Sequence, residues 1–205
     1  MARLRLDTDN IWFTADTHFG HGNIIKYCGR PFRSIADEEA YAGNGGKWPD
    51  RYKISSDAVH AMNKVLVENI NNCVGKDGVL LHLGDFSFRD AHLYLDKIVC
   101  PVHLISGNHD EESSNRLFDS VSDMAEVVVG KRRFILNHYA MALWNKSHRG
   151  SIHLYGHSHA GAEEMLNKAF PDRRSMDVGV DNAALLLGAY RPFSLKEVLN
   201  FTTKG

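Results

Sequence analysis

The segment Gly107-Asn108-His109-Asp110 places an amide, an imidazole and a carboxylate in immediate succession. These groups can act as a metal ligand, a proton donor and a partner that orients the donor, which are the parts of a hydrolytic site. Taken alone, the same segment is also compatible with a turn held by local hydrogen bonds of its Asn and Asp side chains. The choice depends on what the rest of the chain places beside it.

Two other segments carry pairs of potential ligands, Asp16 with His18 and His157 with His159. Side chains two residues apart on an extended chain point the same way, so the members of each pair can converge on one ion. A polar strand end that faces solvent is the alternative for each segment by itself. Single candidates of the same kind are Asp85 and His138.

Each of these segments follows an apolar run that is typical of a buried strand. In sheets whose strands alternate with helices, sites form beyond the carboxyl ends of the strands, so the five segments are expected to meet. The runs cover residues 11–15, 78–83, 102–105, 132–136 and 151–155; a strand over 126–129 completes a hairpin with the fourth run, and a last core strand is predicted over 176–180.

Helical spacing of Val59, Met62, Leu66 and Ile70 predicts a helix over 56–73. Shorter helices are predicted over 23–27, from an N-cap at Ser34, over 90–99 and from a capping box at 194–197. Residues 42–55 contain glycines and a proline that disfavour regular structure, so we expect a loop insertion there. It is either a flap over the site or an inert surface insertion.

The composition predicts one globular domain over residues 1–205, because 43% of the residues are hydrophobic and 24% are charged. The net charge of −1 provides no broad basic surface, so strong nucleic-acid binding is not expected. No apolar stretch predicts a membrane span or a signal peptide, which favours a cytoplasmic protein. The 3 cysteines are too far apart for a thiolate zinc site, whereas 12 histidines are many for this length.

The ordered set Asp16-x-His18, Gly84-Asp85, Gly107-Asn108-His109-Asp110, His138 and Gly156-His157-x-His159 resembles the calcineurin-like metallophosphoesterase family. Within that family, residues 16–25, 30–32 and 147–150 are similar to a group of small bacterial and bacteriophage phosphoesterases. The stretch 42–55 is longer than in those relatives, which leaves the shape of the substrate entrance open. The resemblance implies an α/β fold with four layers, α/β/β/α, in which helices flank two mostly mixed sheets.

The resemblance also implies two divalent transition-metal ions, with a metal-bridging hydroxide that attacks phosphorus. One ion would be held by Asp16, His18, Asp85 and His159, and the other by Asp85, Asn108, His138 and His157. Mixed nitrogen and oxygen ligands suit Mn, Fe, Zn, Co or Ni, among which we favour Mn. His109 would be the general acid for the leaving group, and Asp110 would orient His109 and keep it protonated.

The substrate is expected to be a small phosphate ester, with a phosphodiester or cyclic nucleotide favoured. Candidates for gripping its phosphate are His21, Asn23, Arg30 and Arg149, each with a structural role as the alternative. Hydrolysis of monoesters or phosphoproteins is the second hypothesis, and a nuclease ranks lower because the net charge is near zero. A scaffold that has lost catalysis is the rival from another class, although such relatives can lack the histidine that stands here at position 109. The oligomeric state is left open.

Overall fold

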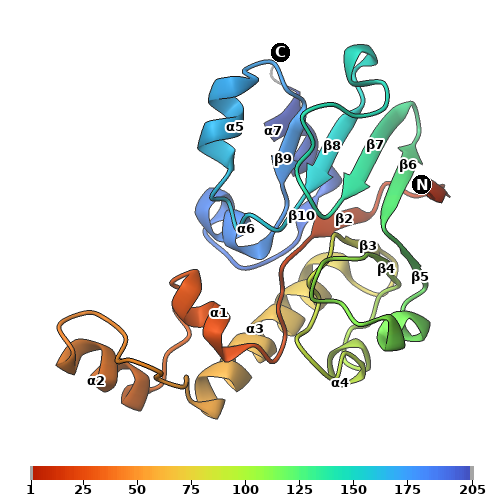
Figure 1. Ribbon diagram of the computed structural model, residues 1–205. Helices are drawn as coiled ribbons and strands as arrows, with labels where there is room; N and C mark the ends of the chain where they lie inside the picture. The colour runs from red at the N-terminus through yellow and green to blue at the C-terminus, as the bar shows by residue number, and fades with distance from the viewer. Residues whose placement is uncertain (1, 204–205) are drawn as a thin grey trace.

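A computed structural model describes residues 2–203 as two five-stranded sheets packed face to face (Figure 1). The first sheet comprises β2 (Ile11–Thr14), β3 (Val79–His82), β4 (Val102–Ile105), β5 (Ser120–Ser122) and β10 (Phe193–Ser194). Its order is β10-β2-β3-β4-β5, in which only the β10–β2 pair is antiparallel.

The second sheet comprises β1 (Ala2–Leu6), β6 (Met124–Val129), β7 (Arg132–Asn137), β8 (Ile152–Tyr155) and β9 (Ser175–Asp177). Its order is β1-β6-β7-β8-β9, with the predicted hairpin of β6 and β7 as its antiparallel pair. Both sheets are therefore mixed, as the resemblance implies. Parallel strands all end on the same side of their sheet, which we call its carboxyl edge. The candidate ligands follow the strands at this carboxyl edge.

Helices lie on the outer sides of both sheets (Figure 1). On the side of the first sheet are α1 (Gly22–Tyr27), α3 (Ser56–Val74) and α4 (His92–Leu95), and on the side of the second is α5 (Glu163–Ala169). The helices α6 (Val180–Leu187) and α7 (Leu195–Thr202) pack on the core between the sheets, and α7 contacts β2 and β10 of the first sheet as well as β9 of the second. The helix α2 (Ile35–Gly43) projects from the body, and two 3-10 turns are η1 (Glu112–Leu117) and η2 (Ser147–Arg149). The predicted α/β class, with two mixed sheets flanked by helices, is confirmed.

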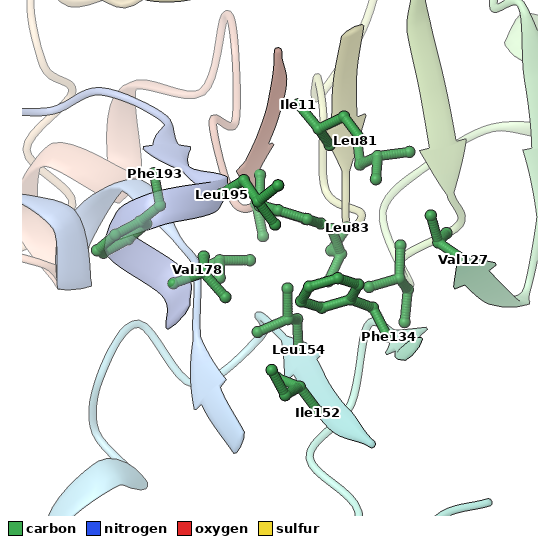
Figure 2. Close-up of a cluster of buried hydrophobic side chains, with 14 of the residues drawn as sticks. Ile11, Leu81, Leu83, Val127, Phe134, Ile152, Leu154, Val178, Phe193 and Leu195 are labelled. Carbon is green, nitrogen blue, oxygen red and sulfur yellow. The ribbon is translucent and has the colours of Figure 1, made fainter. Parts of the chain in front are cut away.

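The main core fills the space between the sheets. In Figure 2, Leu83, which directly follows β3 of the first sheet, lies beside Phe134 of the second sheet, and Leu154 lies close below them. The ring of Phe134 also lies 5.5 Å from that of Phe13, centroid to centroid. A second core packs α3 against the other face of the first sheet. Burial on both faces explains why β3 reads as a continuous apolar run in the sequence.

Several predicted elements have different limits in the structure. The helix expected over 90–99 is the single turn α4, and the loop expected over 42–55 starts later because α2 continues through Gly43. The strand expected over 176–180 ends at Asp177, because Gly179 is the N-cap of α6 and Val180 already belongs to that helix. It is also not the last strand, since β10 follows it. The N-cap at Ser34 and its capping box with Asp37 are present. No helix of residues 2–203 is both long and apolar enough to cross a membrane.

Candidate active site

The candidate ligands meet at the carboxyl edge shared by the two sheets. At this edge a parallel bridge between Ala15 and Gly179 joins the continuation of β2 to that of β9, so the two sheets converge there. The convergence brings together loops that are far apart in the sequence. The candidates Asp16, Asp85 and Asn108 follow β2, β3 and β4, while His138 and His157 follow β7 and β8.

The donor atoms form two groups that share a neighbour. Within each group the atoms lie within 4.8 Å of one another, and Oδ2 of Asp85 lies 3.5 Å from Nε2 of both His18 and His138. This carboxylate therefore stands between the groups. One group is Asp16, His18 and His159, and the other is Asp85, His138 and His157.

These residues fit divalent metal ions by spacing and by donor type. Two ligands that are each about 2.1 Å from one ion lie roughly 3 to 4 Å apart. The separations of Nε2 of His18 from Oδ2 of Asp85 and from Oδ1 of Asp16, 3.5 and 3.9 Å, fall in this range. Both ring nitrogens of the buried His18 lack a hydrogen-bond partner among residues 2–203. Such a buried donor is costly unless something else binds it, and a metal ion would do so.

Two of the histidines are oriented by hydrogen bonds at Nδ1. His138 donates from Nδ1 to the carbonyl oxygen of Leu83 at 2.7 Å, which turns Nε2 toward Asp85 and Asn108. Nδ1 of His159 lies 2.6 Å from Oδ2 of Asp181. Hydrogen bonds of this kind fix the tautomer and the ring orientation of a metal-binding histidine.

Arg30 supports this arrangement from inside the protein. Its side chain is 0% exposed and its guanidinium donates to both carboxylate oxygens of Asp181, at 2.9 and 2.8 Å. It also donates to the backbone carbonyl oxygens of Asp16 at 2.7 Å and Thr17 at 3.1 Å. Arg30 thus ties the loop after β2 to the carboxylate that orients His159. It cannot reach a bound substrate, so its predicted role in gripping phosphate is wrong.

The backbone at the site is held in unusual conformations. Asp16, His18, Asp85, His157 and His159 all have positive φ, between 46° and 67°. Residues other than glycine seldom adopt this left-handed region, and such strain persists where the surrounding structure fixes it. Concentration of these conformations at five candidate ligands is typical of a functional site.

Burial and mutual charge shift the acid–base behaviour of these groups. Burial, with the charges of Asp177 and Asp85, holds the pKa of Asp16 well above its usual range. Burial also lowers the pKa of His18 to about 3, so its imidazole is neutral and able to bind a metal ion. Burial opposes ionisation of Asp85, but hydrogen bonding and charge from His138 outweigh it and lower the pKa. A dication would favour the ionised form of both carboxylates.

His109 and Asp110 lie beside these groups but do not interact as predicted. His109 is exposed, its backbone N–H donates to Oδ1 of Asp85 at 2.9 Å, and its ring centroid lies 5.6 Å from that of His18. The carboxylate of Asp110 instead accepts backbone N–H groups of Asp85, Phe86 and Gly107, each at 2.8 Å. Within residues 2–203 no hydrogen bond joins Asp110 to the His109 ring. The predicted orientation of His109 by Asp110 is therefore wrong, and Asp110 holds the loop of Asp85.

The other substrate-binding candidates lie in different places. His21 is close to the site, with its ring centroid 5.6 Å from that of His18 and stacked at 4.6 Å on Phe88. Asn23 is half-buried in the first turn of α1. Arg149 precedes β8 and lines a hollow with Arg174, which precedes β9, so it lies at the amino edge of these strands. The ligands follow the opposite edge, so the predicted contact of Arg149 with the substrate phosphate is wrong.

Other residues at the site were not among the predicted site residues. The hydroxyl of Tyr139 donates to Oδ1 of Asn108 at 3.3 Å, and its ring packs edge-on against His157, with centroids 4.7 Å apart. Nε2 of His82 lies 3.0 Å from the hydroxyl of Thr17, between the two ligands after β2. Tyr139 could have been identified from the sequence, because it directly follows the candidate ligand His138. For Asp181, at the start of a helix after the last predicted strand, the sequence contains no comparable signal.

A third group of potential ligands, Cys28, His159 and Asp181, does not suit a metal ion. Both oxygens of Asp181 are bound by the guanidinium of Arg30, whose positive charge opposes a nearby cation. Burial also raises the pKa of the Cys28 thiol to about 12, which disfavours the thiolate that a metal needs. This group therefore orients His159 and is not a third metal site.

Comparisons with known proteins agree with this geometry. Residues 52–171 match the calcineurin-like phosphoesterase superfamily domain. An uncharacterized protein of Methanocaldococcus jannaschii is 26% identical over 200 residues, which cover 95% of this chain and 92% of that protein. The gene 66 protein of Mycobacterium phage D29 is 24% identical over 84% of this chain and 88% of its own length. The crystal structure of a protein of unknown function from Aquifex aeolicus has a TM-score of 0.65, with 21% identity, over 93% of this chain and 98% of that chain. This last likeness shows a shared fold.

Proposed function

The chain belongs to the calcineurin-like phosphoesterase superfamily, and on this premise we propose that it is a dinuclear metal-dependent phosphodiesterase for small substrates. Membership implies metal-dependent hydrolysis of phosphate esters. The number of metal ions, the diester preference and the residue roles below are the proposal.

The observation that carries the proposal is the position of Asp85. Its Oδ2 lies 3.5 Å from Nε2 of His18 on one side and 3.5 Å from Nε2 of His138 on the other. A carboxylate equally close to donors of both groups is placed to bridge two ions. One ion would be held by Asp16, His18, Asp85 and His159, and the other by Asp85, Asn108, His138 and His157.

Two bound divalent ions would supply positive charge for the phosphoryl oxygens and lower the pKa of water to near neutrality. The protein contributes two ligand carboxylates, Asp16 and Asp85, against about four positive charges, which leaves a centre of about +2 that attracts an anionic ester. The mixture of imidazole, carboxylate and amide donors favours Mn²⁺, Fe, Zn²⁺, Co²⁺ or Ni²⁺ over Mg²⁺ and Ca²⁺, which prefer shells of oxygen alone. Among them we propose Mn²⁺.

His109 is proposed as the general acid. Its backbone is fixed to Oδ1 of Asp85, so its ring is held at a constant place beside the ligands while remaining exposed to substrate. An alkoxide is a poor leaving group, and a proton from a positioned imidazolium speeds its departure by about 10²- to 10⁴-fold.

A diester is favoured over a monoester because the two predicted arginine contacts are absent from the site. Arg30 is buried against Asp181 and Arg149 lies at the opposite edge of β8, so neither can hold the terminal dianion of a monoester. A diester carries a single negative charge and needs no such clamp. Hydrolysis of monoesters or phosphoproteins is the second proposal, since the metal ions themselves can hold a dianion.

The test starts from protein stripped of metal by a chelator. It should not hydrolyse bis(p-nitrophenyl) phosphate, and Mn²⁺ or Ni²⁺ should restore hydrolysis; full activity of the stripped protein would refute the mechanism. His109→Ala should keep two metal ions per chain and lose about 10²- to 10⁴-fold in kcat on a diester whose leaving group is an alkoxide, such as a dinucleoside monophosphate. On bis(p-nitrophenyl) phosphate the loss should be much smaller, because p-nitrophenolate leaves readily without a proton. His60→Ala, on the exposed side of α3, is the matched control and should behave like the unmodified protein. A scaffold without catalysis would show no turnover in any of these proteins.

A further inference from the structure

A half-open cleft of about 790 Å³ adjoins one side of the candidate metal centre. The candidate ligand His159 forms part of its wall, so the cleft begins next to a residue of the candidate metal centre. Three separate parts of the chain form the rest: the end of α1, the helix α6 and the segment before β10. The large side chains that these parts contribute are Tyr27, Leu185 and Tyr190.

Large apolar groups are unusually exposed around this cleft. Tyr27 is 72% exposed and Leu185 is 74% exposed, although both are side chains that proteins tend to bury. They come from different parts of the chain, since Tyr27 ends α1 and Leu185 lies in α6. Exposed apolar side chains that face a common hollow, rather than being scattered singly, mark a place where a ligand binds.

The cleft contains no free charge that would select an ionic group. Among its lining residues the carboxylate of Asp181 is already paired with Arg30 and bound to His159, and Nε2 of His159 faces Asp16. A second phosphate or an acidic peptide would therefore find no cation there. A neutral group with apolar surface suits these walls, and a planar ring suits two tyrosines best, since aromatic rings pack well on one another.

The leaving group of the ester has a different place. It must lie next to His109 to receive a proton, and His109 is not among the residues that line the cleft. The substituent that stays on phosphorus is thus the part available for the cleft. We propose that the cleft formed by Tyr27, Leu185 and Tyr190 binds a planar aromatic ring on the retained substituent of the phosphodiester, and so determines substrate preference. This inference rests on the proposed function and names its substrate class.

The experiment uses the full chain loaded with Mn²⁺ and three diesters that all release p-nitrophenol. Their retained substituents are methyl, phenyl and thymidin-5′-yl, so the leaving group and its chemistry are constant. Burying a ring in the cleft should raise kcat/KM for the phenyl or thymidinyl ester about tenfold or more over the methyl ester. A preference for thymidinyl over phenyl would identify a nucleoside as the source of the ring, and the reverse would identify an aryl group.

Leu185→Ala should lower this preference ratio about five- to tenfold, because it removes one apolar wall of the cleft. Leu185 is exposed, so the substitution should not disturb folding. Ile35→Ala is the matched control, since Ile35 is an isomer of leucine that is 82% exposed on α2 and does not line the cleft. It should leave the ratio unchanged.

Equilibrium binding separates this inference from the proposed function. Calorimetry should show that metal-loaded protein binds phenylphosphonate about tenfold more tightly than methylphosphonate, and that Leu185→Ala reduces the difference. If none of the three esters is hydrolysed, the proposed function fails, while the binding ratio still tests the cleft. Ratios near one in binding, or a ratio that Leu185→Ala does not change, would overturn the inference.

Discussion

Replacement of Arg30 by methionine tests how the site is held together. The guanidinium makes charged hydrogen bonds to both oxygens of Asp181 and two more to backbone carbonyls, all without exposure to water. Methionine has a similar length but no donor. Arg30→Met would therefore leave the carboxylate of Asp181, whose side chain is 8% exposed, with His159 as its remaining partner.

The expected loss of stability is large. Removing one member of a buried ion pair costs about 3 to 5 kcal/mol, because the other charge stays buried without its partner. For a chain of this size each kcal/mol lowers Tm by about 2 to 4 °C, so Tm should fall by roughly 6 to 20 °C. The pKa of Asp181, now lowered to about 2 because hydrogen bonds from His159 and Arg30 outweigh its burial, should rise in the variant.

Urea unfolding and calorimetry of the metal-free protein would measure this loss without any contribution from bound ions. The double variant Arg30→Met/Asp181→Leu removes both charges and should regain most of the stability, although it should bind metal more weakly because His159 loses its orienting carboxylate. A loss below about 1 kcal/mol in Arg30→Met, or a double variant less stable than the single one, would refute the reasoning. A side chain that only gripped substrate would change KM and leave Tm alone.

Three more predictions follow from separate parts of the molecule. Gly107→Ala should lower metal affinity at least about tenfold by equilibrium dialysis, because the added methyl group collides with the side chain and backbone of Asp85; unchanged affinity would contradict this. Glu197→Gln should remove part of the acid sensitivity of folding. The hydrogen bond from Arg191, followed by hydrogen bonds from Ser194, lowers the pKa of Glu197 from 4.5 to about 2, although partial burial raises it. Because solvent screens this partly exposed ion pair, the shift contributes only about 1 to 2 kcal/mol of stability. This contribution is present above pH 4.5 and is lost as the pH falls toward 2, so urea unfolding of the variant should depend less on pH in that window. Cys28 should react with iodoacetamide far more slowly in the folded than in the unfolded protein at pH 8, because burial raises its pKa to about 12 and only about one thiol in 10,000 is ionised; equal rates would contradict this.

The sequence by itself predicted the class of fold and the places where polar groups leave the core. Apolar runs such as 102–105 mark strands because burial requires them, and the residues that follow these runs must lie at the carboxyl edge of a parallel sheet. Asp16 and His18 lie in one group of donor atoms, but they follow the end of β2 and both have positive φ, so the alternation of an extended strand does not explain why they converge. Elements that depend on tertiary contacts were less predictable: the strand β5, Ser120–Ser122, is too short and polar to stand out, and forms because β4 supplies its partner.

Only the tertiary structure decided the roles of the charged residues around the site. Arg30 and Asp181 are 151 residues apart, so no spacing or periodicity connects them, and their pairing follows from the convergence of the two sheets. Asp110 stands next to His109 in sequence but turns toward the backbone of Asp85, because the amide groups there would otherwise lack acceptors. Arg149 falls at the wrong edge because the parallel β8 has to cross the whole sheet between it and His157. The local hydrophobic pattern determines which polar side chains follow the end of a strand. The partner that each of these side chains contacts depends on which distant strand ends beside it.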